Sequence, residues 1–244
     1  MKKILVAFVM LISALSFSQE KVLLRLNYQK GDVYQVALKM NQDMGEMMKL
    51  DIQMVMEMKV TEVKEESFMT EASFKNVKMD MNAMGQQMKY DSNMKESEMD
   101  AFAQGAHSSM KDLLSTLIAF EYDKRGNVIN TKVISGNGNV KDFQDNFSSM
   151  VLPEEEVTVG STWSAMKSTK EGSKMDYVYE VTAINSDNVE VKVSGSISGE
   201  ENAISGKGTI NRETGNMKDM DMDLIIKVQG QKVNSKVLMT TTKK

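Results

Sequence analysis

Apolar and polar residues alternate with a period of two along most of this 244-residue chain. The clearest example is Leu50–Val60, where Met54, Met56 and Met58 share one side and charged or amide residues, apart from Val55, occupy the other. This pattern is typical of antiparallel strands that bury one face and expose the other. The same alternation recurs at 34–40, 68–81, 177–181, 189–193 and 220–228. Between 68 and 81 it slips by one residue, which predicts a β-bulge near Lys75–Asn76.

Two segments follow a helical period instead. Between 97 and 116, apolar residues recur every three or four positions, and Ser97 with Asp100 forms a weak version of a capping box. A second, shorter run spans 140–150, with Asn139 as its expected N-cap. The stretch between the two predicted helices has the pattern of a β-hairpin.

The whole pattern predicts a mainly β fold of about twelve antiparallel strands. These strands form either an incomplete barrel or two packed sheets, with two helices covering the open side. The length of the chain fits a single β-rich domain over 19–244.

A short motif occurs twice and suggests an internal repeat. Gly31 precedes Tyr34 by three residues, and Gly160 precedes Trp163 by the same spacing. Each copy is followed by a second strand that ends in Val-Thr, at Val60-Thr61 and Val181-Thr182. We therefore predict pseudo-repeats at 28–95 and 157–241, flanking a helix–hairpin–helix segment at 96–152. Chance similarity between short β motifs is the alternative.

The first eighteen residues have the composition of a secretory signal peptide. Lys2 and Lys3 precede an apolar run that ends near Leu15, and Ser16 and Ser18 provide a small-x-small cleavage site. We expect cleavage of 1–18 and an exported protein, periplasmic or secreted, that is soluble and not embedded in a membrane. The chain contains no cysteine, which excludes disulfides, thiolate metal sites and cysteine nucleophiles. A net charge of −4 with mixed signs argues against nucleic acid as a partner.

Three stretches carry a family resemblance: "DMGEMM", "AMGQQMKYDS" and "LPEEEVTVGSTW". With the Gly-x-x-Tyr strand entry, they resemble an uncharacterised exported β-rich family of Bacteroidetes-type bacteria, a domain of unknown function. That resemblance implies no activity. The architecture also resembles, more loosely, the lipoprotein-carrier half-barrels of the periplasm. This second likeness implies a curved antiparallel sheet that wraps helices and holds acyl chains.

Residues with catalytic potential are few. The single histidine, His107, lies on the flank of the predicted helix and has no sequence signal for a partner serine and carboxylate. Asp219–Asp223 resembles the start of a calcium loop, but Leu224 stands where that loop needs glycine and Gly230 where it needs glutamate. We predict a protein that is not an enzyme and has no cofactor; a hydrolase with an unrecognised carboxylate pair stays open.

Methionine is the remaining candidate, with 24 residues in the chain. A run of methionines on a strand can be plain core, a flexible apolar lining, or soft ligands for Cu(I). We predict an envelope protein that binds an apolar ligand, such as a lipid, or a partner protein in a methionine-lined β cavity. Copper handling and a purely structural or interaction role are the alternatives, and no metal ligands are assigned. A Cu(I) site would need sulfurs from neighbouring strands, and the sequence offers Met54, Met56 and Met58, Met79 and Met81, and Met220 and Met222, which we expect to lie on such strands. The predicted ligand-binding residues are Met54, Met56, Met58, Met79, Met81, Met220 and Met222.

Overall fold

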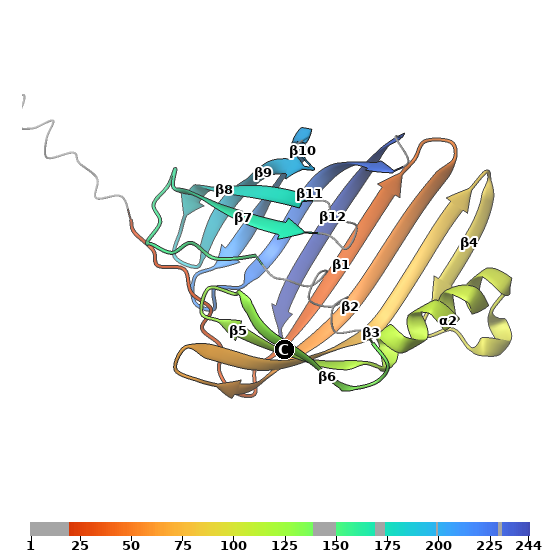
Figure 1. Cartoon of the computed structure of the whole chain (residues 1–244), viewed down its shortest axis with the longest axis horizontal. Helices are drawn as coiled ribbons and strands as arrows, with labels where there is room; N and C mark the ends of the chain where they lie inside the picture. Colours follow the sequence, from red (N-terminus) through yellow and green to blue (C-terminus); the bar gives the residue numbers. More distant parts are fainter. Residues whose placement is uncertain (1–19, 139–149, 169–173, 199, 229–230) are drawn as a thin grey trace, which may run out of the picture.

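The structure, a computed structural model, describes residues 20–138, 150–168, 174–198, 200–228 and 231–244 (Figure 1). Its helical elements are a 3₁₀ turn, η1 (Glu96–Glu98), and one α-helix, α2 (Ala101–Ser115). The strands are β1 (Val33–Asp43), β2 (Met48–Val63), β3 (Ser67–Ala83), β4 (Gln86–Asp91), β5 (Leu117–Asp123), β6 (Val128–Ser135), β7 (Thr162–Ser168), β8 (Lys174–Ile184), β9 (Asn188–Ile197), β10 (Glu200–Asn211), β11 (Met217–Val228) and β12 (Gln231–Lys243).

All twelve strands belong to one antiparallel sheet. Its order is β6-β5-β3-β2-β1-β12-β11-β10-β9-β8-β7, and β4 pairs with β3 off this path. The first and last strands of the chain therefore lie side by side in the middle of the sheet (Figure 1). The sheet is not closed into a barrel, so the predicted fold class is confirmed in its incomplete-barrel form.

The helix prediction needs one correction and leaves one part outside the described residues. Asp100, and not Ser97, is the N-cap of α2: its side chain accepts a hydrogen bond from the backbone N–H of Ala103 at 2.8 Å. Residues 96–98 instead form η1, because the chain turns once more before Asp100 adopts the extended backbone that a cap requires. The second predicted helix, 140–150, lies almost entirely outside the described residues.

The predicted β-bulge is present at Lys75. Val55 of β2 pairs with Asn76 of β3, but the next residue, Met56, pairs with Phe74. The extra residue keeps Phe74 and Val77 on the same buried side of β3, although they are an odd number of positions apart.

One end of the sheet is closed by the segment 20–31, which has no extended strand pairing. Val22 makes an isolated bridge to Val157, and Leu24 is fully buried in the main core. The N–H of Leu26 donates to Lys124 O at 2.7 Å, and the N–H of Asn27 donates to Thr214 O at 3.0 Å. Residues 124 and 214 belong to turns at distant places in the strand order, so the sheet must curve for one segment to reach both.

The two copies of the Gly-x-x-aromatic motif have the same local geometry. Gly31 and Gly160 have φ of 95° and 88°. The N–H of Gly31 donates to Val60 O at 2.9 Å, and that of Gly160 donates to Val181 O at 2.8 Å. Glycine accepts positive φ without a steric penalty, which explains its place in both copies. A duplication remains a prediction that these matched contacts support.

Candidate ligand-binding face

The strand register places most apolar side chains on one side of the sheet, here called the apolar face. Residues directly opposite each other in a ladder point to the same side, so the even-numbered residues of β1 and β2 define it. The same ladders extend this face in both directions, from β3 on one side to β11 on the other. The opposite side, the charged face, carries cross-strand ion pairs such as Lys49–Asp43 at 3.2 Å and Lys236–Asp221 at 2.8 Å.

The apolar face has two halves that differ in burial. Its closed half lies under the segment 20–31 and residues 150–157, and includes Tyr34, Val60, Phe120 and Val191, all nearly inaccessible to solvent. Its open half lies toward the other end of the strands, and most of its apolar side chains are only half-buried, although Met222 and Val233 are buried. The open half comprises Val36, Leu38, Met40, Leu50, Ile52, Met54, Met56, Met79, Met81, Met220, Leu224, Ile226, Val237 and Met239.

The seven predicted methionines all lie on the apolar face. Met58 and Met222 are buried, with 8% and 7% of their surface exposed. The other five are half-buried in the open half. Met54 and Met79 also pack against a second cluster, formed by Val77 and Tyr90 with α2. The structure therefore brings these residues to one surface, which includes both core and accessible positions.

The sheet order separates the methionines into two groups. We expected those of β11 to neighbour those of β2 and β3, and this expectation is wrong: β1 and β12 lie between β11 and β2. Three strand spacings correspond to roughly 14 Å along the sheet. Within β2 and β3, Met54 lies opposite Val77 and Met79 opposite Ile52. A Cu(I) site needs several converging sulfurs, and no predicted methionine of β2 lies directly opposite a predicted methionine of β3.

The other candidate residues make structural contacts. His107 Nδ1 lies 3.3 Å from the hydroxyl of Tyr90, where α2 packs on β4. Asp219 accepts a hydrogen bond from Thr209 at 2.9 Å, and Asp221 pairs with Lys236. Among the described residues, no cluster of three or more His, Asp or Glu side chains could hold a metal ion. No helix in this part of the chain is both long and apolar enough to cross a bilayer.

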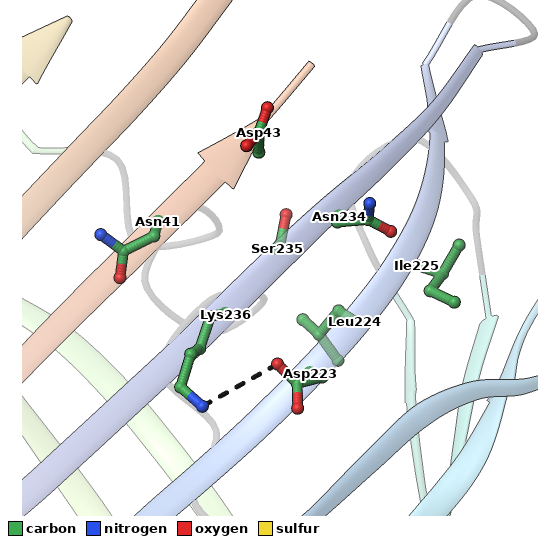
Figure 2. A pocket seen from close by; sticks show the side chains of 8 residues that line it. All are labelled: Asn41, Asp43, Asp223, Leu224, Ile225, Asn234, Ser235 and Lys236. Atoms are coloured by element: carbon green, nitrogen blue, oxygen red, sulfur yellow. Dashed lines mark ion pairs between the residues drawn. The ribbon is translucent and has the colours of Figure 1, made fainter. Parts of the chain in front are cut away.

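A shallow depression lies where β1, β11 and β12 approach the open end of the sheet (Figure 2). It is lined by Asn41, Asp43, Asp223, Leu224, Ile225, Asn234, Ser235 and Lys236. Of these, only Leu224 and Ser235 belong to the apolar face by register. Lys236 Nζ lies 2.8 Å from Asp221 and 4.0 Å from Asp223, so the ammonium group is already paired with carboxylates of this chain. This depression is therefore a poor site for an apolar ligand.

A polar network that the sequence did not reveal lies at the closed end. The hydroxyl of Tyr34 donates to Asp32 Oδ2 at 3.1 Å, and Lys243 Nζ lies 2.8 Å from Asp32 Oδ1. Burial by itself would raise the pKa of Asp32, but hydrogen bonds from Lys243, the Gln29 N–H and Tyr34 outweigh it and lower that pKa. Burial, followed by the Asp32 charge, raises the pKa of Tyr34. The network joins the start of β1 to the end of β12.

The lowered pKa of Asp32 predicts a pH-dependent contribution to stability. Its carboxylate is stabilised in the folded state, so this contribution is present above the unfolded pKa and is lost as pH falls through the folded pKa. We expect Asp32→Asn to lower the free energy of unfolding by about 1–2 kcal/mol at pH 7. The difference from the wild type should shrink as pH falls from about 5 toward 3. Urea denaturation at several pH values tests this, and a difference that is constant with pH would contradict it.

Neither a protein-family model nor a curated protein sequence matches this chain. Its fold is similar to that of lipovitellin, in a structure described as "Lipid-protein interactions in lipovitellin", with a TM-score of 0.50 and 10% identity. The match covers 89% of this chain and 25% of the lipovitellin chain, so this chain spans about a quarter of that protein's length. At this identity the likeness concerns the fold alone.

Two further solved structures match with low scores. One is a DUF1329 family protein from Desulfovibrio piger, with a TM-score of 0.22 and 9% identity, covering 88% of this chain and 85% of that one. The other is a putative outer membrane lipoprotein-sorting protein domain from Vibrio parahaemolyticus, with a TM-score of 0.21 and 9% identity, covering 86% and 83%. The expected membership of an exported Bacteroidetes-type family stays a prediction.

Proposed function

We propose that the open half of the apolar face binds the acyl chain of a lipid, and that the protein carries or senses this lipid in the cell envelope without catalysing a reaction. The observation that carries this proposal is the half-buried state of a continuous apolar surface over β3, β2, β1, β12 and β11. Soluble monomers rarely leave large contiguous apolar patches without a binding role.

The dimensions of the open half suit an acyl chain. From Met56 to Leu50, β2 advances by six residues, which is about 20 Å at roughly 3.3 Å per residue. One leaflet of a bilayer holds its chains within about 15 Å, half of the roughly 30 Å hydrocarbon core. A chain can therefore lie along the strands without leaving the apolar surface.

The composition of the lining also supports a lipid. Methionine side chains are unbranched and flexible, and they adapt to contents of variable shape. Five of the seven predicted methionines are half-buried here, where they can contact a ligand. The fold is similar to that of lipovitellin, whose structure is described for its lipid–protein interactions, and this likeness is consistent with a lipid ligand for this chain. The predicted signal peptide supports a place in the envelope.

A charge placed on the open half tests the proposal. We expect Leu38→Lys to weaken binding of a fluorescent fatty acid at least tenfold, because an ammonium group in an apolar site must be desolvated. Ala37→Lys is the matched control, since it adds the same charge to the next residue, on the charged face. It should bind like the wild type. Native mass spectrometry of protein purified without detergent should also detect a retained lipid. Equal binding by the two variants would contradict the proposal.

A further inference from the structure

We infer that Ser235 and Gln42 form a polar anchor that holds the uncharged acyl-ester group of the bound lipid at the outer end of the open half. This inference rests on the proposed function and specifies which class of lipid the same surface selects.

The two residues lie opposite each other where the apolar row of β1 ends, and on β12 and β11 Val233 and Ile226 of this row lie farther out. Gln42 of β1 pairs with Ser235 of β12, one step before β1 ends at Asp43. In the ladders on either side of this pair, Gln42 lies opposite Leu50 of β2, and Ser235 lies opposite Leu224 of β11. Ser235 and Leu224 come from adjacent strands at this end of the sheet (Figure 2). The pair is thus a polar interruption of an apolar surface, on the side away from the closed half.

The hydrogen-bonding capacity of the pair is largely unused. Ser235 is 4% exposed, and its hydroxyl has no hydrogen-bond partner among the protein groups that the structure describes. Gln42 Nε2 contacts Met40 Sδ at 3.5 Å, and a thioether is a weak acceptor. A buried hydroxyl without a partner costs free energy, so buried polar groups are normally paired. A ligand oxygen at this position would supply the missing partner.

Other buried hydroxyls do not offer the same opportunity. Thr70 and Thr131 also lack partners, but they flank Phe120 across β3, β5 and β6 in the closed half. That half is filled by the packed core. Ser235 differs because Leu224, opposite it on β11, and Val237, two residues along β12, are half-buried and can face a ligand.

The charge distribution identifies the kind of ligand group. A hydroxyl and a carboxamide are neutral, whereas phosphates and carboxylates are usually bound by Arg or Lys. The nearby charges, Asp43 and Lys236, lie on the charged face and are paired with Lys49 and Asp221. The anchor therefore suits an ester carbonyl or an adjacent glycerol hydroxyl, and not an ionised head group.

Binding of two probes to matched variants tests this anchor. We expect Ser235→Ala and Gln42→Leu each to weaken binding of 1-monooleoylglycerol about tenfold. Their affinity for the apolar dye N-phenyl-1-naphthylamine, which has no ester, should stay within twofold of the wild type. Asn234→Ala, on the charged face beside Ser235, should change neither affinity. Ser235→Ala should also raise the thermal midpoint, because it removes an unpaired buried hydroxyl.

The outcomes separate the anchor from the proposed function. If the variants bind monooleoylglycerol as the wild type does, while the wild type binds both probes, the anchor is overturned and the proposed function stands. If the wild type binds neither probe, both are overturned. Methyl oleate, which has the ester and no hydroxyl, distinguishes the two contacts: a parallel loss of its binding supports the anchor at the ester, and a loss for monooleoylglycerol alone overturns that assignment.

Discussion

Leu24→Ala should lower the free energy of unfolding by about 3–4 kcal/mol, while Leu23→Ala should change it by less than about 0.5 kcal/mol. The two residues are neighbours in the segment 20–31, which has no extended strand pairing. Leu24 is fully buried in the main core, whereas Leu23 is 51% exposed. The larger cost reflects lost apolar contacts and the cavity left behind. Urea denaturation of both variants measures the difference.

Equal effects of the two substitutions would mean that the segment does not fill the closed end. The contrast matters because this segment separates the two halves of the apolar face. Its backbone hydrogen bonds reach the turn after β5 and the turn after β10. It therefore fixes the curvature of the sheet at one end and leaves the side chains of the other end accessible.

The fold class could be predicted because one face of this antiparallel sheet is exposed to solvent and the other is buried. In such a sheet the buried positions appear in the sequence as an alternation of apolar and polar residues. In β2, the alternation of Met54, Met56 and Met58 with polar residues is enough to identify a strand and its inner face. The bulge at Lys75 could be predicted for the same reason. When the alternation shifts by one residue, the strand must contain one extra, unpaired residue to keep its apolar side chains on one face.

The order of the strands could not be predicted from such local patterns. Nothing in β1 or β12 alone indicates that the two pair, and the expectation about β11 failed on this point. The segment 20–31 shows a related limit. Val22, Leu24, Leu26 and Tyr28 alternate as in a strand and are buried, yet they are held by isolated contacts and not by a ladder.

The candidate site was predictable in its apolar part only. The seven methionines could be identified in the sequence by residue type and spacing, and all seven lie on the apolar face. Gln42 and Ser235 are ordinary polar residues in strands distant in sequence, and only the ladder between β1 and β12 brings them together. The one local signal was the alternation of Ser235 with Val237 and Met239, which places a hydroxyl on a row of apolar side chains.

Gly215→Ala should lower the free energy of unfolding by about 3 kcal/mol or more, whereas Gly45→Ala should cost only about 1–2 kcal/mol. The two glycines have nearly equal φ, 71° and 70°, so both variants bear the same penalty for a side chain in the left-handed region. They differ in their surroundings. A Cβ at Gly215 would lie 2.2 Å from Arg25 O, while one at Gly45 would have no atom within 4 Å.

The contact at Gly215 cannot be relieved easily, because Arg25 is held on both sides. Its guanidinium donates to Pro153 O at 2.8 Å and to Glu154 O at 2.6 Å, and the next residue, Leu26, donates to Lys124 O. The turn at Gly215 must therefore move away from the segment 20–31 and open the closed end. Denaturation of both variants gives the stability difference, and hydrogen exchange at the Asn27 N–H, which donates to Thr214 O, shows where it arises. If Gly215→Ala were as mild as Gly45→Ala, the turn would not be pressed against this segment. The closed end would then be too loose to confine a ligand to the open half.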